Sequence, residues 1–180
     1  NAIWGLFYAL HWANMPRFSE FFWLDMTYFG VVLNPLAFLL FALCYVGSIR
    51  LFRKSRLFLL SIVPVLTLIF LWTDPLLGIF FAGKRLSGTS MIYSGGFGFW
   101  LYVIWAYSLI FISILTILKA LIRYPKKYRD QMAMILLGVS FPVAASLLSF
   151  ANVFPFPKLD LTPIAFSLTG LFFALAILRY

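Results

Sequence analysis

The sequence predicts an all-α integral membrane protein, a bundle of six transmembrane helices. Of its 180 residues, 64% are hydrophobic and 11% are charged, whereas soluble domains are roughly 45–50% apolar and about 25% charged. Apolar stretches near the ~20 residues that a helix needs to cross a bilayer recur along the whole chain, with short polar gaps between them. The lipid bilayer is therefore the expected solvent, and residues 1–180 are predicted to form a single transmembrane domain.

The helices are expected at about 2–13, 22–46, 57–73, 97–122, 132–153 and 161–178. The first ends before Pro16, because proline cannot continue a helix. The second and third contain prolines in their interiors, Asn34-Pro35 and Pro64, and the fifth contains Pro142. Each of these positions is a candidate hinge, since prolines kink transmembrane helices. The short first run and the absence of an initiator Met suggest one further helix upstream, which would make seven.

The basic residues predict the orientation. If loops alternate across the membrane, ten lie on one side: Arg50, Arg53, Lys54, Arg56, Lys119, Arg123, Lys126, Lys127, Arg129 and Arg179. Four lie on the other: Arg17, Lys84, Arg85 and Lys158. Short loops rich in Lys and Arg face the cytoplasm, so Asn1 and Tyr180 are expected to be cytoplasmic in a multi-pass protein of the cell membrane. Anionic lipid head groups are the expected partners of the basic loops, rather than nucleic acid.

Residues for catalysis are scarce. The chain has one histidine, His11, and five acids, so a metal site with two histidines is excluded. It contains neither a Gly-x-Ser-x-Gly motif nor a Gly-rich phosphate loop, and residues 161–178 contain no lysine for a retinal Schiff base. We expect no catalytic residue, metal or cofactor in this segment.

Polar side chains lie toward the outer ends of the helices, with aromatic side chains at similar depth. Together they are candidates to line an outward-facing ligand pocket: His11, Asp25, Trp72, Asp74, Trp100, Tyr102, Asn152 and Asp160. Apolar walls with a few convergent polar groups are the usual form of a small-molecule site.

Each polar residue also has a structural interpretation. A cap or turn is the favoured role for Asp74 and Asp160, and for Asp25 the two interpretations are balanced. His11 could instead form an interhelical hydrogen bond. Asn34 could satisfy the backbone carbonyl that the Pro35 kink sets free.

Several blocks of residues occur in a characteristic order along the chain. They are Phe41-Ala42-Leu43 with Tyr45 and Gly47; Pro64 and Trp72-Thr73-Asp74; Tyr93, Gly96 and Phe99-Trp100; Arg129-Asp130-Gln131, Gly138 and Pro142; and Leu159-Asp160-Leu161-Thr162-Pro163 with Phe166, Gly170 and Arg179-Tyr180. This order resembles the N-terminal seven-transmembrane region of bacterial and archaeal sensor histidine kinases, which also precedes some diguanylate cyclases.

The resemblance implies a sensor for an unknown small or lipophilic ligand. It further implies a homodimer and a cytoplasmic output domain after residue 180, to which the last helix would relay the signal. Two alternatives stay open on the residues alone, namely a six-helix substrate-binding membrane subunit of a transporter and a membrane assembly subunit without a ligand.

Overall fold

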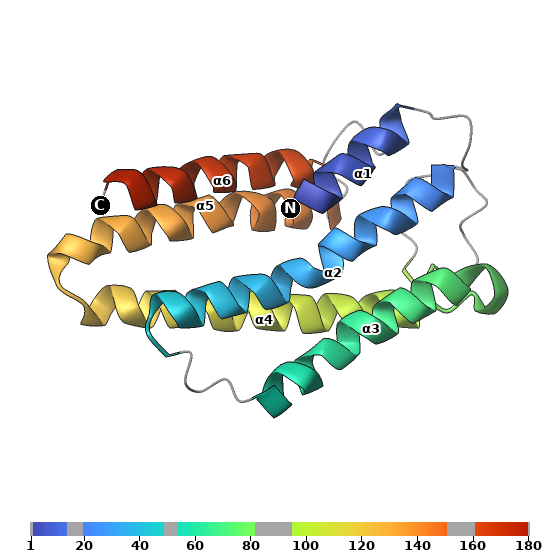
Figure 1. Cartoon of the computed structure of the whole chain (residues 1–180), viewed down its shortest axis with the longest axis horizontal. Helices are drawn as coiled ribbons and strands as arrows, with labels where there is room; N and C mark the ends of the chain where they lie inside the picture. Colours follow the sequence, from blue (N-terminus) through green and yellow to red (C-terminus); the bar gives the residue numbers. More distant parts are fainter. Residues whose placement is uncertain (1, 14–19, 49–53, 82–94, 151–160, 180) are drawn as a thin grey trace. The chain divides into compact units, whose positions relative to one another are not determined.

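A computed structural model describes residues 2–13, 20–48, 54–81, 95–150 and 161–179. Its helices are α1 (Ala2–Trp12), α2 (Glu20–Tyr45), α3 (Lys54–Leu77), α4 (Phe97–Arg123), α5 (Lys126–Phe150) and α6 (Thr162–Arg179), and these ranges contain no strand (Figure 1). Four apolar helices are long enough to cross a membrane, and Ile164–Leu178 forms a shorter apolar one. The predicted all-α membrane fold is confirmed.

Two helices extend further than the sequence suggested. Helix α3 continues past Pro75 and ends at Leu77, followed by Gly78 with φ of 61°. The Gly78 N–H donates to the Asp74 carbonyl at 2.8 Å, so a left-handed glycine closes this helix. Helix α5 begins at Lys126, immediately after Pro125, since a proline is well tolerated where a helix starts.

The end of α2 is closed by a second glycine. Gly47 has φ of 74°, and its N–H donates to the Cys44 carbonyl at 3.0 Å, while the Ser48 N–H donates to the Leu43 carbonyl at 2.8 Å. This pair of bonds is a Schellman motif, which satisfies carbonyls at the helix end and needs a residue in the left-handed conformation.

The described chain forms two compact units, residues 1–110 and residues 111–180. In the first unit, α2 packs against α1 and α3 and against the first half of α4. One cluster brings Val32 of α2 together with Tyr102 and Ala106 of α4, and partly buried Leu68 of α3 packs against it. A second cluster contains Leu36, Leu39 and Leu109.

Helix α1 approaches α2 at a glycine. A Cβ placed on Gly30 would lie 2.7 Å from the Trp4 backbone nitrogen and 2.9 Å from its Cβ. Small residues at interfaces let transmembrane helices approach backbone to backbone. Gly30 therefore sets how closely α1 packs on α2.

In the second unit, α5 and α6 lie side by side and run antiparallel (Figure 1). A Cβ on Gly138 of α5 would lie 3.0 Å from Cβ of Phe172, and the rings of Phe141 and Phe172 stack at 5.4 Å. Ile117 at the end of α4 and Ile135 of α5 are almost fully buried. Apolar contacts thus join α5 and α6 within this unit.

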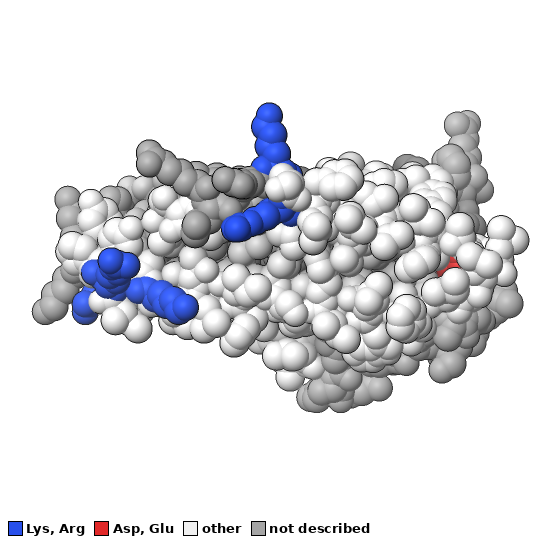
Figure 2. Space-filling model, turned by 90° about the horizontal axis from the view of Figure 1, so that it is seen from below, with Lys and Arg blue, Asp and Glu red and all other residues white. Residues whose placement is uncertain are grey.

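The distribution of polarity suits a lipid solvent. Thr67, Ser113 and Thr169 are buried, whereas large apolar side chains such as Phe58 and Leu178 are 74% and 84% exposed. In water this arrangement would leave extensive apolar surface unprotected, but in a bilayer the exposed side chains contact lipid tails. Among the residues that Figure 2 colours, Lys and Arg side chains stand out from a surface that is mostly white, and little acidic surface is visible.

Candidate functional site

The first unit contains six of the eight predicted pocket residues. His11 lies in the last turn of α1, and Asp25 lies near the start of α2. Trp72 and Asp74 lie near the end of α3, and Trp100 and Tyr102 in the first turns of α4. Within this unit Figure 1 draws these four helix ends on the same side. Asn152 and Asp160 lie outside the described residues.

Asp74 organises the turn that follows α3. Its side chain is 3% exposed, and its Oδ1 accepts hydrogen bonds from the backbone N–H groups of Phe80 at 2.6 Å and Phe81 at 3.0 Å. A carboxylate that accepts bonds from backbone N–H groups forms strong, charge-assisted contacts. In the described structure Asp74 therefore holds a backbone turn.

That turn is joined to the start of α4. The Gly96 N–H donates to the Phe80 carbonyl at 2.6 Å, and the Gly98 N–H donates to the Ile79 carbonyl at 3.1 Å. A side chain on Gly96 would collide with the Ile79 carbonyl oxygen. Asp74 thus fixes, through residues 79–81, the place where α4 begins.

Aromatic rings pack beneath this turn. The ring of Phe80 lies 5.4 Å from that of Tyr28, 4.8 Å from that of Phe81 and 5.8 Å from that of Phe99, and all three pairs are edge-to-face. Such pairs contribute about 0.5–1.5 kcal/mol each beyond their buried area. Phe80, Phe81 and Phe99 are buried, so side chains fill the space between α2, α3 and α4 here.

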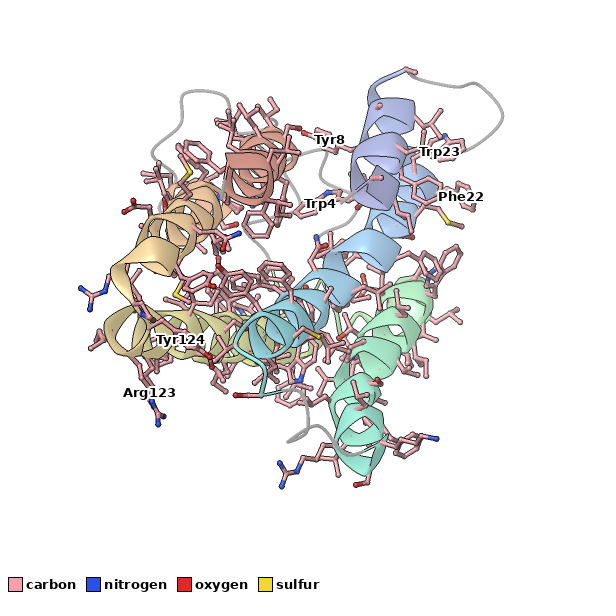
Figure 3. The ribbon with its side chains drawn as sticks, turned by 60° about the vertical axis from the view of Figure 1, so that its left-hand side comes forward. Trp4, Tyr8, Phe22, Trp23, Arg123 and Tyr124 are labelled. Atoms are coloured by element: carbon pink, nitrogen blue, oxygen red, sulfur yellow. The ribbon has the colours of Figure 1, made fainter. Side chains whose placement is uncertain are left out.

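Larger aromatic side chains surround this cluster and remain accessible. Trp72 is 43% exposed and Trp100 is 51% exposed. The ring of Phe22, at the start of α2, lies edge-to-face with Trp72 at 6.1 Å and with Trp23 at 5.3 Å (Figure 3). Tryptophans near the ends of membrane-spanning helices commonly anchor a protein in the membrane interface, and their exposed rings also present a surface to an apolar molecule.

Asp25 is the second buried acid of this region, at 6% exposure. It lies inside α2, two residues before Thr27, whose hydroxyl donates to the Leu24 carbonyl of the same helix at 2.6 Å. A carboxyl group within a membrane-spanning helix is costly and is by default a candidate functional group.

Tyr102 faces α2 rather than an open pocket. It is 6% exposed, and its hydroxyl donates to the Val31 carbonyl at 2.9 Å. In a helix this carbonyl would accept from the N–H of residue 35, which is a proline and has none. Tyr102 is therefore the donor to the Val31 carbonyl, in the place where Asn34 was expected. The buried Nδ2 of Asn34 has no hydrogen-bond partner within the described part of the chain.

Two further hydrogen bonds connect α5 and α6, and the sequence did not single out their donors as functional. The Thr169 hydroxyl donates to the Gly138 carbonyl at 2.7 Å, and Nε2 of Gln131 donates to the Ala176 carbonyl at 3.0 Å. Gly138 lies four residues before Pro142. Counting back four residues from each helix proline is the signal that would have identified this carbonyl, and Val31, as acceptors in need of a donor.

Among the described residues, no group of three or more His, Cys, Asp or Glu could hold a metal ion. The features of this site that a ligand could meet are an aromatic surface, two buried carboxyl groups and the bent helix α2.

Comparison with known proteins identifies a family. The model of a family described as the N-terminal 7TM region of histidine kinase matches residues 1–180. No curated protein and no solved structure matches the chain.

Proposed function

This chain belongs to the family of N-terminal 7TM regions of histidine kinases, and from that premise we propose how this transmembrane sensor region works. A small or lipophilic stimulus acts at the outer helix ends of the first unit. The resulting rearrangement passes through the last helix, α6, to a cytoplasmic kinase domain.

One observation carries the choice of site. Within the described residues, the two buried acids Asp25 and Asp74 and the half-exposed rings of Trp72 and Trp100 all belong to the first unit, near its shared helix ends. Accessible aromatic surface suits an apolar stimulus. Asp74 fixes the start of α4 through the turn at residues 79–81. A stimulus that binds beside Asp74 would therefore act on the position of α4.

Helix α4 provides a covalent route onward. It runs without interruption from Phe97 to Arg123 and contributes residues to both units. At its end, Nε of Arg129 donates to the Tyr124 carbonyl at 3.3 Å, which satisfies a carbonyl just after α4 with a cation, as helix C-termini favour.

Helix α6 is joined to α5 at two levels. The Thr169–Gly138 bond joins the middles of the two helices, and the Gln131–Ala176 bond lies in the last turn of α6. We therefore expect α5 and α6 to move together, and the signal to leave the membrane as a displacement of this pair. Such a switch shifts by no more than the stimulus's differential affinity for the two packings.

The orientation and the partners belong to the same proposal. The exposed basic residues at the start of α3, Lys54 and Arg56, and at the α4–α5 turn, Arg123 and Arg129, would face anionic lipid head groups of the cytoplasmic leaflet. Figure 3 shows Arg123 projecting away from the end of α4. The sensor would work as a homodimer in the cell membrane.

The proposal is tested with the full-length protein in vesicles of phosphatidylethanolamine and phosphatidylglycerol, by measuring ATP-dependent autophosphorylation. Replacing Trp72 and Trp100 by alanine should change the basal level by about five-fold or more, the lower range of typical allosteric coupling. Phe58→Ala is the control, because Phe58 is an exposed apolar residue near the opposite end of α3. A protein without phosphorylation, or with equal effects of all three substitutions, would contradict the proposal and favour a transporter subunit or an assembly subunit.

A further inference from the structure

The prolines inside α2 and α5 leave defined backbone carbonyls without their helical partner. In an α-helix each carbonyl accepts from the N–H four residues later, and proline has no N–H. Pro35 therefore frees the Val31 carbonyl, and Pro142 frees the Gly138 carbonyl. In the hydrocarbon core no water is available to replace the lost bond, so a donor from the protein stabilises such a carbonyl.

In both helices the donor is a hydroxyl from another helix of the same unit. The Tyr102 hydroxyl of α4 donates to the Val31 carbonyl at 2.9 Å. The Thr169 hydroxyl of α6 donates to the Gly138 carbonyl at 2.7 Å. Tyr102 and Thr169 are each 6% exposed; the Thr169 bond is buried and the Tyr102 bond is partly buried.

The hydroxyls near Pro64 in α3 show a different arrangement. Ser61 donates to the Leu57 carbonyl at 2.8 Å, and Thr67 donates to the Val63 carbonyl at 2.8 Å. Both bonds lie within α3 itself, which is the common behaviour of Ser and Thr in helices. The bonds to Val31 and Gly138 differ from these two because each joins two helices and ends on a carbonyl that a proline leaves without its helical donor.

We propose that Tyr102 and Thr169 are latches, each of which ties the proline site of one helix to the position of its neighbour. When α4 shifts along α2, the Tyr102 bond breaks and α2 is free to flex at Pro35. When α6 shifts along α5, the Thr169 bond breaks and α5 is free to flex at Pro142. The role of these latches in signalling rests on the proposed sensor function. The link between each proline-containing helix and its neighbour does not depend on that function.

Each latch has a group that can form a hydrogen bond after release. At Thr169 it is a second acceptor for the hydroxyl, and at Val31 it is a second donor to the carbonyl. The Thr169 hydroxyl also lies 3.1 Å from the Ala165 carbonyl of its own helix, so it keeps an acceptor after it leaves Gly138. Asn34 lies three residues after Val31, within the range in which such side chains bond back to their own helix. Its buried Nδ2, which has no partner in the part of the chain that the structure describes, is a donor that can take over from Tyr102.

A double-mutant cycle tests each latch in the full-length protein in lipid nanodiscs. Tyr102→Phe and Thr169→Val remove the donors, whereas Pro35→Ala and Pro142→Ala restore an N–H to the acceptors. Each donor substitution should lower the equilibrium constant for folding by about three-fold, as for a typical interhelical hydrogen bond in a membrane. In the matching alanine background the effect should vanish, because the new N–H occupies the same carbonyl.

Tyr128→Phe and Thr116→Val are the matched controls. Tyr128 is 46% exposed, and the Thr116 hydroxyl donates only within α4, to the Ile112 carbonyl at 2.7 Å. If Tyr102→Phe lowers the equilibrium constant for folding equally with and without Pro35, the Tyr102 latch is overturned. The same result for Thr169→Val with and without Pro142 would overturn the Thr169 latch. If a variant fails to fold in nanodiscs, hydrogen exchange of the amides after Val31 and Gly138 in native membranes gives the same comparison.

Autophosphorylation of the same variants tests the switch role. Tyr102→Phe and Thr169→Val should shift basal phosphorylation relative to their two controls. An intact coupling cycle with unchanged phosphorylation would overturn the switch role. A wild-type protein that is not phosphorylated at all would instead count against the proposed sensor function, while the folding cycle would remain interpretable.

Discussion

Asp74 illustrates how a single side chain in this protein determines the position of a helix that follows much later in the chain. Its carboxylate accepts the N–H groups of Phe80 and Phe81, and residues 79 and 80 in turn accept the N–H groups of Gly96 and Gly98. The start of α4 is thereby fixed by one acid at the end of α3. Removing that acid should affect the whole first unit rather than its surface alone.

We expect Asp74→Ala to destabilise the protein by about 1–3 kcal/mol for each N–H left buried without a partner. Asp74→Asn, which keeps one carbonyl oxygen as an acceptor, should cost less. Thermal unfolding in lipid nanodiscs measures both. Thr73→Ala is the control, because the Thr73 hydroxyl forms an exposed hydrogen bond to the Ile69 carbonyl of its own helix. If Asp74→Ala and Thr73→Ala were equally mild, the turn would not depend on the carboxylate.

The sequence predicted part of this residue chemistry. A turn or cap was the favoured role for Asp74, and that was inferable because Pro75 follows it and several glycines lie beyond. The contact of Tyr102 with Val31 joins residues that are 71 positions apart, and no local pattern relates them. Only the tertiary packing of α4 on α2 reveals which hydroxyl reaches the carbonyl that Pro35 frees.

At the scale of the elements, glycines set the distances between paired helices. Gly30 lets α1 contact α2 backbone to backbone, and Gly138 makes room on α5 for the side chains of Phe172 and Phe173 of α6. At Gly5 and Gly170, by contrast, an added Cβ would meet no atom within 4 Å. Substitutions at Gly30 and Gly138 thus test tight helix contacts, and substitutions at Gly5 and Gly170 are controls without such contacts.

We expect Gly30→Ala to destabilise the first unit by about 1–3 kcal/mol, the usual cost of overpacking, because Trp4 backbone atoms must move. Gly5→Ala should be neutral or stabilise α1 by up to about 1 kcal/mol, since alanine is the better helix former. Denaturant unfolding of both variants in the same detergent compares them directly. Equal behaviour of the two substitutions would show that α1 does not pack closely on α2.

Apolar runs in the sequence indicated the approximate positions of the described helices, of which four are long enough to cross a membrane. They were less informative about helix ends. The sequence placed the end of the third helix near Thr73, yet α3 continues to Leu77 before Gly78 closes it. The fifth helix was expected from Met132, yet α5 starts at Lys126, since a polar first turn that lies outside the apolar run leaves no hydropathy signal.

At the scale of the whole molecule, the described residues combine an apolar core that holds a few polar side chains with a surface that is also largely apolar. Thr67, Ser113 and Thr169 are buried, and large apolar side chains cover the surface. Lys and Arg outnumber Asp and Glu by 14 to 5 in the complete sequence, and the described basic residues Lys54, Arg56, Arg123 and Arg129 lie at or just beyond helix ends. This distribution predicts a defined orientation in the membrane.

We expect labelling by a membrane-impermeant maleimide to report that orientation in intact cells. The one native cysteine, Cys44, is first replaced by serine, and single cysteines are then introduced at residues 54, 77, 97 and 129. Positions 77 and 97 should be labelled directly, and positions 54 and 129 only after the membrane is permeabilised. The reverse pattern would contradict the positive-inside assignment and the outer position of the candidate site.

The order of synthesis gives the two interhelical hydrogen bonds a consequence for how the protein is made. Tyr102 follows Val31 by 71 residues, and Thr169 follows Gly138 by 31, so each bent helix leaves the ribosome before its donor exists. At roughly 5–20 residues per second, the Val31 carbonyl of α2 has no hydrogen bond from Tyr102 for on the order of 4–14 s. For the Gly138 carbonyl of α5 and its donor Thr169, the interval is about half as long. Each helix must therefore be sheltered by the insertion machinery, or by its own polar side chains, until its partner arrives.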